Sequence, residues 1–174
     1  MKINLNFAGR KNRILFWLFS FLALVIMVAI FILSAENSYK SSDTSGGVIR
    51  WFLKLFYPTF ISTSAESQQA LVEGFQHIAR RLAHGSIYAL LGFSLTGAWT
   101  QILGLNAFKR AVFPWLVAVI YCITDEIHQY FVPGRSCQLT DMLIDSLGAA
   151  VGVLLMLLLW EAIKYFGKGR KRQE

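Results

Sequence analysis

The chain has 174 residues, of which 55% are hydrophobic and 16% are charged, and its mean hydropathy is +0.49. This composition excludes an ordinary soluble domain and is typical of a single-domain protein that crosses a membrane several times. The net charge of +7 would also suit a nucleic-acid-binding protein. However, the basic residues flank apolar runs, so we predict membrane lipids with anionic headgroups as partners and exclude nucleic acid.

The first apolar run covers residues 14–33 and follows a basic tail at residues 1–13. It has about the 20 residues that a membrane-spanning helix needs. A basic start before an apolar segment also suits a signal peptide, but this run is longer than such segments, and no clean cleavage site follows it. We therefore predict an uncleaved span whose N-terminal tail lies in the cytoplasm.

The long connection after this span is expected to lie outside the cell and contains an amphipathic pattern. Apolar residues recur at the spacing of one helix face, namely at Val48, Trp51, Phe52, Leu55 and Phe56. This spacing predicts a short helix in the outer membrane interface. Such a helix would cap the bundle or, as an alternative, would gate a site that faces the lipid.

The second predicted span covers residues 82–100 and continues a helix that starts near a capping box formed by Thr63 and Glu66. Small residues recur along one side of this span, at Gly85, Ala89, Gly92 and Thr96. That stripe predicts a face that packs closely against another helix.

Two further spans follow, separated by the turn signal Pro133-Gly134. The third, residues 111–132, reaches membrane thickness only if its helix continues past Asp125. The fourth covers residues 140–165 and precedes a basic tail at residues 166–174. The predicted fold is all-α, with residues 14–165 forming a bundle of four transmembrane helices. We expect a multi-pass protein of the bacterial cytoplasmic membrane with both termini inside.

The most polar stretch lies between the third and fourth apolar runs. Residues 125–135 read DEIHQYFVPGR and are followed by Asp141, Asp145 and Gly148. This pattern resembles the signature of the VanZ-like family of small bacterial membrane proteins, and residues 31–36 and 80–92 fit the same family. Its name-giving member is associated with resistance to teicoplanin. The resemblance implies a role in the cell envelope, with a glycopeptide antibiotic or a lipid-linked cell-wall precursor as a partner.

Charged side chains inside an apolar bundle are costly, so they either neutralise one another or line a functional site. The four-span topology places most of them in the outer half of the bundle. The candidate catalytic residues are Asp125, Glu126, His128 and Asp141. The candidate substrate-binding residues are Glu36, Arg80, Arg81, His84, Tyr88, Gln129, Arg135 and Asp145.

Four interpretations of this cluster are open. Nearly balanced acids and arginines suit a structural ion-pair network without catalysis. Arginines at the outer end of a bundle also suit a site for a lipid phosphate or polar head. A hydrolase or transferase acting on a lipid-linked or cell-wall substrate would use His128 beside Asp125 as base or acid, although no known catalytic signature is present. A proton relay for transport is the fourth. A metal site built from His84, His128 and two aspartates is geometrically conceivable, but the tight spacing of metal ligands is absent, so no metal is predicted. No cofactor is predicted either.

Overall fold

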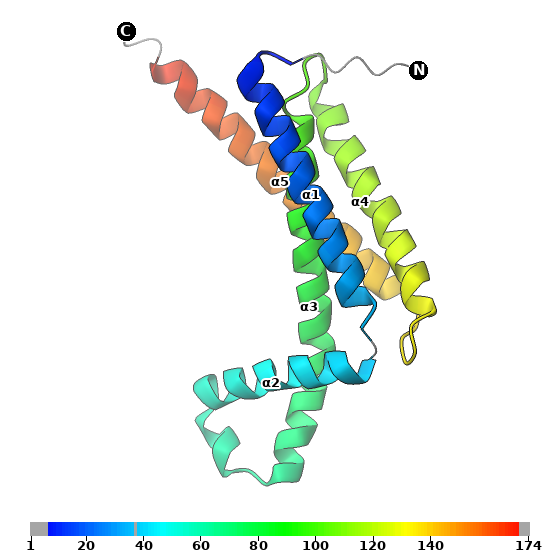
Figure 1. Cartoon of the computed structure of the whole chain (residues 1–174). Coiled ribbons are helices and arrows are strands. Elements are labelled where there is room, and N and C mark those ends of the chain that lie inside the picture. The colour runs from blue at the N-terminus through cyan, green and yellow to red at the C-terminus, as the bar shows by residue number, and fades with distance from the viewer. Residues whose placement is uncertain (1–6, 37, 171–174) are drawn as a thin grey trace.

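The structure is a computed structural model in which residues 7–36 and 38–170 are described, and the regular elements in this part of the chain are all helices (Figure 1). Their bounds are α1 (Arg10–Ser34), α2 (Ser38–Phe56), the 3-10 helix η1 (Pro58–Ser62), α3 (Ala65–Trp99), α4 (Ala107–Tyr130) and α5 (Leu139–Arg170). The prediction of an all-α fold is therefore confirmed.

Three helices in the described ranges are long and apolar enough to cross a membrane: Arg10–Ser34, Ala107–Tyr130 and the Leu139–Tyr165 part of α5. They contain the first and fourth predicted spans and all but the last two residues of the third, because α4 ends at Tyr130. The second predicted span is the C-terminal half of α3, which is not among these three. That half lies among the other long helices and contacts each of them. Its buried residues include small and hydroxyl-bearing ones, which make its sequence less apolar than that of the other three helices.

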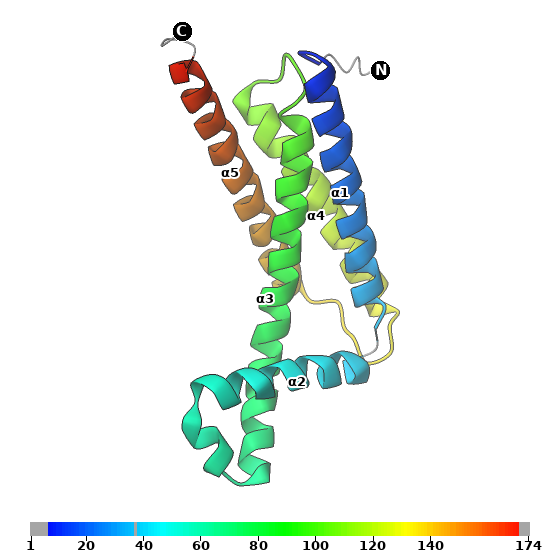
Figure 2. The same cartoon turned by 60° about the vertical axis from the view of Figure 1, so that its left-hand side comes forward.

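The long helices lie side by side and alternate in direction. In both views the start of α1 and the end of α5 lie at one end of the bundle, and the α4–α5 loop lies at the other (Figures 1 and 2). The C-terminal half of α3 returns the chain between these ends. Serine and threonine on this half donate to carbonyls of their own helix, as Thr96 Oγ1 does to Gly92 O at 2.8 Å. These bonds satisfy hydroxyl groups that would be costly in an apolar surrounding.

Among the helix pairs, α3 and α5 pack most extensively, and glycines make this possible. A Cβ on Gly152 would lie 2.7 Å from Ala89 C and 2.8 Å from Phe93 N, and would overlap Ala89 O. A Cβ on Gly148 or on Gly92 would likewise overlap backbone of the facing helix. The predicted small-residue face of α3 therefore meets glycines of α5, as expected for closely packed helices in a membrane protein.

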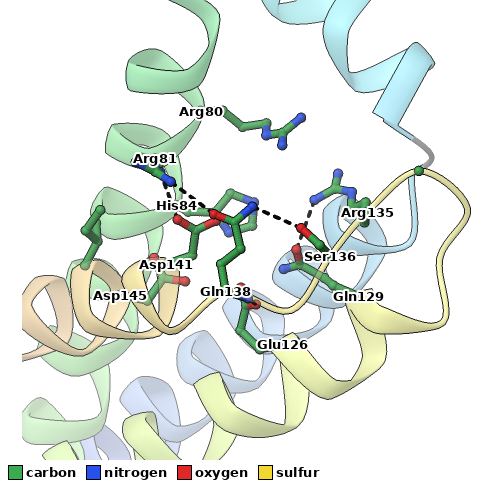
Figure 3. Close-up of a pocket in the computed structure, with 12 residues that line it drawn as sticks. Arg80, Arg81, His84, Glu126, Gln129, Arg135, Ser136, Gln138, Asp141 and Asp145 are labelled. Atoms are coloured by element: carbon green, nitrogen blue, oxygen red, sulfur yellow. Dashed lines mark hydrogen bonds and ion pairs between the residues drawn. The ribbon is translucent and has the colours of Figure 1, made fainter.

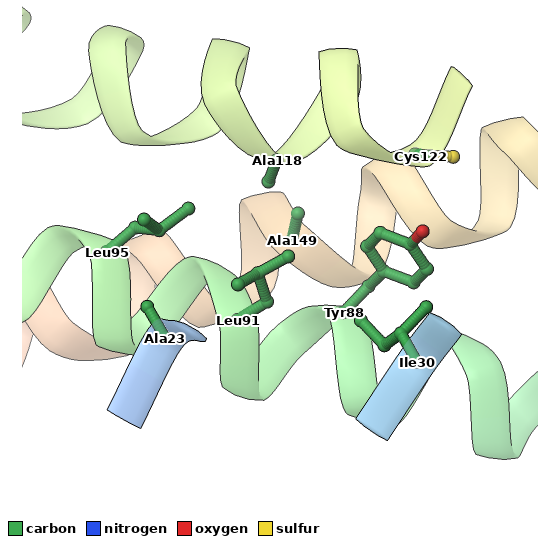
Figure 4. Packing of buried hydrophobic residues seen from close by; sticks show 8 residues of the cluster. All are labelled: Ala23, Ile30, Tyr88, Leu91, Leu95, Ala118, Cys122 and Ala149. Atoms are coloured by element: carbon green, nitrogen blue, oxygen red, sulfur yellow. The ribbon is translucent and has the colours of Figure 1, made fainter. Parts of the chain in front are cut away.

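A core of buried apolar side chains joins all four long helices (Figure 4). It contains residues from α1, α3, α4 and α5, namely Ala23, Ile30, Tyr88, Leu91, Leu95, Ala118, Cys122 and Ala149. Two hydrogen bonds to backbone carbonyls reinforce it. Tyr121 Oη donates to Met27 O at 2.6 Å, and Trp115 Nε1 donates to Ser146 O at 3.1 Å. Each bond connects α4 to a neighbouring helix.

A second, smaller core lies under α2, which crosses α3 in the region where α3 leaves the bundle (Figure 2). Ile49, Phe60 and Val72 are its buried residues. Here α3 begins at Ala65, and Ser64 caps it by accepting from Ser67 N at 3.3 Å. The predicted cap at Thr63 was therefore one residue early, because Thr63 Oγ1 donates to Phe60 O at the end of η1.

The amphipathic helix of the long connection is present and is longer than predicted, since α2 has 19 residues. Its inner side packs through Ile49 against α3. The predicted apolar face is largely uncovered: Val48, Trp51, Phe52, Leu55 and Phe56 are all more than half exposed. The placement of this face in the membrane interface stays a prediction.

Candidate functional site

A polar cavity of about 190 Å³ lies at the end of the bundle that holds the α4–α5 loop (Figure 3). Three segments that are distant in the sequence form its walls: α3, the end of α4, and the stretch from the loop into α5. The lining residues are Arg80, Arg81, His84, Glu126, Gln129, Gly134, Arg135, Ser136, Gln138, Asp141, Ile144 and Asp145. Three arginines and three acidic residues therefore share one small space.

A tight turn closes one side of the cavity. Gly134 follows Pro133 and has φ 77°, a left-handed conformation that glycine adopts without steric cost. The chain reverses there and runs back past the end of α4, which brings Arg135, Ser136 and Gln138 to the cavity. The predicted turn at Pro133-Gly134 is therefore confirmed, and it positions the site.

Glu126 links the end of α4 to the start of α5. Its side chain is only 2% exposed, and Oε2 accepts from Gln138 N at 3.0 Å. Gln138 directly precedes the first residue of α5, where free N–H groups and the helix dipole favour a carboxylate. Helix capping thus explains in part why a carboxylate is buried at Glu126. The side chain also faces the cavity.

Among the described residues that line the cavity, one arginine–carboxylate ion pair forms. Arg81 Nε lies 2.9 Å from Asp141 Oδ1, and Arg81 Nη2 donates to Gln138 Oε1 at 3.1 Å. The two side chains of the pair are 40% and 29% exposed. Such exposed pairs contribute little to stability, typically about 0–1 kcal/mol.

Arg135 bonds to backbone carbonyls of α1 and to an amide side chain. Its Nε donates to Glu36 O at 2.9 Å and its Nη2 to Leu33 O at 3.2 Å, so the guanidinium caps the C-terminal end of α1. Its Nη1 donates to Gln129 Oε1 at 3.4 Å. Burial lowers the pKa of Arg135 from its ordinary value, and the charge of Arg80 acts in the same direction.

Arg80 differs from the other two arginines. Figure 3 draws no hydrogen bond or ion pair from its guanidinium to the other residues that line the cavity. Two further groups have unused hydrogen-bonding capacity: within the described residues, His84 Nδ1 and Asp145 Oδ1 are buried and have no partner. Asp145 is only 2% exposed. Because buried polar groups are normally paired, these atoms are candidates for contact with a polar ligand.

Asp125 lies outside this cavity and faces α1. Its Oδ2 accepts from Ser34 Oγ at 2.9 Å and from Gln129 Nε2 at 3.1 Å, and the side chain is 3% exposed. Gln129 Nε2 also lies 3.3 Å from Ser34 Oγ. These three groups form a buried polar junction whose hydrogen bonds connect α1 to α4.

His128 and Tyr88 also lie outside the cavity lining. The ring of His128 stacks on Phe31 of α1, with centroids 4.5 Å apart, and its Nε2 has no hydrogen-bond partner among the described residues. Asp125 is directed to Ser34 and Gln129 instead, so the structure does not form the base-and-carboxylate pair that the sequence suggested. Tyr88 is fully buried in the apolar core.

The structure thus brings together eight of the twelve candidate site residues. They are Arg80, Arg81, His84, Glu126, Gln129, Arg135, Asp141 and Asp145. Glu36 lines an adjoining apolar groove. Three further lining residues were not predicted, namely Ser136, Gln138 and Ile144. The first two are polar loop residues and the third is an apolar helix residue, and neither kind carries a distinguishing signal in the sequence. Ser34, which occurs in the first family-like block, was not predicted either.

In the described part of the chain, no group of three or more His, Cys, Asp or Glu side chains is arranged to hold a metal ion. The side chains that line the cavity offer guanidinium, carboxylate, amide, hydroxyl and imidazole groups. Arginine side chains bind phosphate and carboxylate through paired N–H donors, whereas the acids accept from hydroxyl or amine groups.

Comparison with known proteins agrees with the family resemblance. No curated protein and no solved structure matches the chain. Residues 19–160, which include all of α3 and α4, most of α1 and α5, and every residue of the cavity, match the VanZ/LLP1 family. The chain therefore belongs to the VanZ/LLP1 family of proteins.

Proposed function

We propose that the chain crosses a bacterial cytoplasmic membrane four times, with both ends inside and the polar cavity at the outer leaflet. The C-terminal half of α3 runs beside the three apolar helices and carries the chain back between α1 and α4 (Figure 1). Basic residues mark the opposite end from the cavity: Arg10, Lys11 and Arg13 begin α1, and Lys109 and Arg110 lie in the first turn of α4. This distribution supports the predicted orientation.

We further propose that the cavity binds the phosphate of an envelope lipid or of a lipid-linked cell-wall precursor. The observation that carries this function is Arg80, whose guanidinium faces the cavity without a carboxylate or amide partner among the other lining residues (Figure 3). A purely structural ion-pair network would pair the arginines with the acids. Among the described arginines that line the cavity, Arg81 forms an ion pair with a carboxylate, whereas Arg135 bonds to carbonyls and an amide.

Lipid binding at this place offers a role in the cell envelope that accords with the family. A protein that holds a lipid head or a wall precursor at the outer leaflet competes with molecules that act there, including lipid-bearing glycopeptides such as teicoplanin. We propose that lowered sensitivity to such compounds results from this competition.

The binding test uses the purified full chain in detergent and native mass spectrometry. Dioleoyl phosphatidylglycerol, which is anionic, is compared with dioleoyl phosphatidylcholine, which is zwitterionic. We expect wild type to retain the anionic lipid about tenfold more strongly, and Arg80→Gln to lose this preference, since hydrogen bonds to charged groups contribute about 1.5–3 kcal/mol. Arg50→Gln is the matched control, because Arg50 lies on α2 and lines neither the cavity nor the groove. Equal retention of both lipids by wild type would contradict the proposal.

The cellular test measures teicoplanin and vancomycin susceptibility in a Gram-positive host that expresses wild type, Arg80→Gln or Arg50→Gln at equal membrane levels. Protection against teicoplanin by wild type and by Arg50→Gln, but not by Arg80→Gln, would connect the cavity to the envelope role. If wild type gave no protection, the role in lowering teicoplanin sensitivity would be rejected. Lipid binding would still be decided by the lipid-retention measurement.

A hydrolase or transferase at the same cavity is the second candidate, and one observation favours it. Glu126 and Asp145 are both only 2% exposed, and both face the cavity beside His84. Buried carboxylates next to an imidazole can give and accept a proton in general acid–base catalysis. Turnover of a lipid-linked phosphate substrate by wild type, lost in Glu126→Gln and Asp145→Asn at normal membrane levels, would support catalysis.

A further inference from the structure

An apolar groove of about 320 Å³ adjoins the polar cavity. It lies between the end of α1, the second half of α2, and α3, and its apolar walls include Ile30, Leu33, Val48, Ile49, Ala83 and Ile87. Pockets for small ligands commonly have volumes of about 300–1,000 Å³. The groove is therefore large enough to receive part of an elongated apolar molecule.

The groove and the cavity share three polar lining residues. Arg80, His84 and Arg135 line both spaces. A molecule that occupied both would place a charged group against two guanidinium groups and an apolar part against α1, α2 and α3. The two spaces together thus have the amphipathic character of a lipid.

The position of α2 explains how such a molecule would reach the groove. Val48 and Ile49 of α2 line it, while the neighbouring residues Trp51 and Leu55 are 65% and 58% exposed on the outer face of the helix. A helix with this exposed apolar face suits the membrane interface. The mouth of the groove would then face the lipid, and a chain would enter sideways from the membrane.

We propose that the groove holds a hydrocarbon chain of an anionic membrane phospholipid whose phosphate lies in the cavity at Arg80 and Arg135. This inference rests on the proposed function. The apolar groove favours a lipid that enters from the bilayer over a water-soluble phosphate as the ligand of the cavity. Hydrocarbon gains little by moving from a bilayer into protein, since both are apolar. The groove therefore positions the chain, and the arginines supply the preference for an anionic head.

The test extends the lipid-retention measurement with variants that fill the groove. Ala83→Trp places a large side chain at an exposed position of α3 that lines it, and Val48→Trp does the same from α2. Leu82→Trp is the matched control, because Leu82 is 64% exposed on α3 and lines neither space. All variants are checked for unchanged thermal unfolding in detergent before lipid is added.

We expect Ala83→Trp and Val48→Trp to retain dioleoyl phosphatidylglycerol about tenfold less strongly than wild type, as expected for steric overpacking, with Leu82→Trp unchanged. Loss of the anionic preference in Arg80→Gln with full retention in both groove variants would overturn the groove inference and leave the proposed function standing. If wild type retained both lipids equally and the groove variants retained both less strongly, the phosphate site would be overturned. The groove would then stand as a site for hydrocarbon.

Discussion

The contact between α3 and α5 and the contact between α1 and α4 are built in different ways. The first brings two backbones together at Gly92, Gly148 and Gly152, where side chains would collide. The second is less extensive and contains hydrogen bonds, from Tyr121 Oη to Met27 O and from Ser34 Oγ to Asp125 Oδ2. One contact depends on the absence of side chains, and the other depends on polar ones.

This difference relates to where the candidate site lies. Helices in lipid gain no hydrophobic driving force by associating, so close packing and polar bonds have to hold them together. At Gly92, Gly148 and Gly152 the backbones of α3 and α5 are in contact, so no space is left between the two helices there. The polar cavity and the groove occur at the end where Arg135 joins α4 and its loop to α1. Substitutions on the two sides should therefore have different consequences.

The largest expected effect is on the glycine contact. Gly152→Ala should lower the free energy of unfolding by more than about 3 kcal/mol, because the added Cβ meets backbone atoms that cannot move aside. Gly74→Ala is the control, since a Cβ there meets nothing within 4 Å and alanine favours a helix by about 1 kcal/mol over glycine. Unfolding of both variants in mixed micelles measures the difference. Equal stability of the two would show that the helices are further apart than the structure has them.

Arg135→Gln should have the next largest effect, a loss of about 2 kcal/mol, because it removes charge-assisted bonds to two carbonyls at the end of α1. Arg81→Gln removes a partly exposed ion pair and should change stability by less than about 1 kcal/mol. The same unfolding measurement ranks the two variants. A larger loss in Arg81→Gln would mean that the ion pair, and not the α1 cap, holds this end together.

Ser34→Ala should lower stability by about 1 kcal/mol. It removes one of the two donors to Asp125, and hydrogen bonds between membrane helices contribute on average about 0.6 kcal/mol with a maximum near 1.7. Ser94→Ala is the comparison: that hydroxyl donates to Leu90 O of its own helix and connects no second helix, so its loss should be nearly neutral. Equal effects of the two substitutions would remove the support for a polar α1–α4 junction.

Much of this architecture was predictable because hydropathy and glycine spacing are local signals. Residues 14–33 and 140–165 fall on α1 and α5, and the third predicted span falls on α4 up to residue 130. Gly85 and Gly92 of the predicted packing face meet α5. Local signals also place the polar residues at one end of the bundle. Hydropathy identifies α3 less well, because a helix surrounded by other helices needs no apolar outer surface.

The direction of individual side chains was not predictable. His128 was expected beside Asp125. Neighbouring residues of a helix point about 100° apart, however, so Gln129 bonds to Asp125 while His128 stacks on Phe31. Which side of α4 meets α1 depends on the whole bundle. The groove could not be seen in the sequence either, since α1, α2 and α3 each supply only a few apolar residues to it.

The smallest effect on stability is expected for Arg80→Gln, and it separates binding from folding most sharply. Arg80 forms none of the hydrogen bonds or ion pairs drawn in Figure 3, so its loss should change the free energy of unfolding by no more than about 0.5 kcal/mol. Dioleoyl phosphatidylglycerol at ten times its Kd should stabilise wild type by about 1.4 kcal/mol and should not stabilise the variant. Stabilisation of both by the lipid would place the phosphate elsewhere. If Arg80→Gln were much less stable than wild type without lipid, Arg80 would hold helices together as Arg135 does. The cavity would then be one more polar junction between helices.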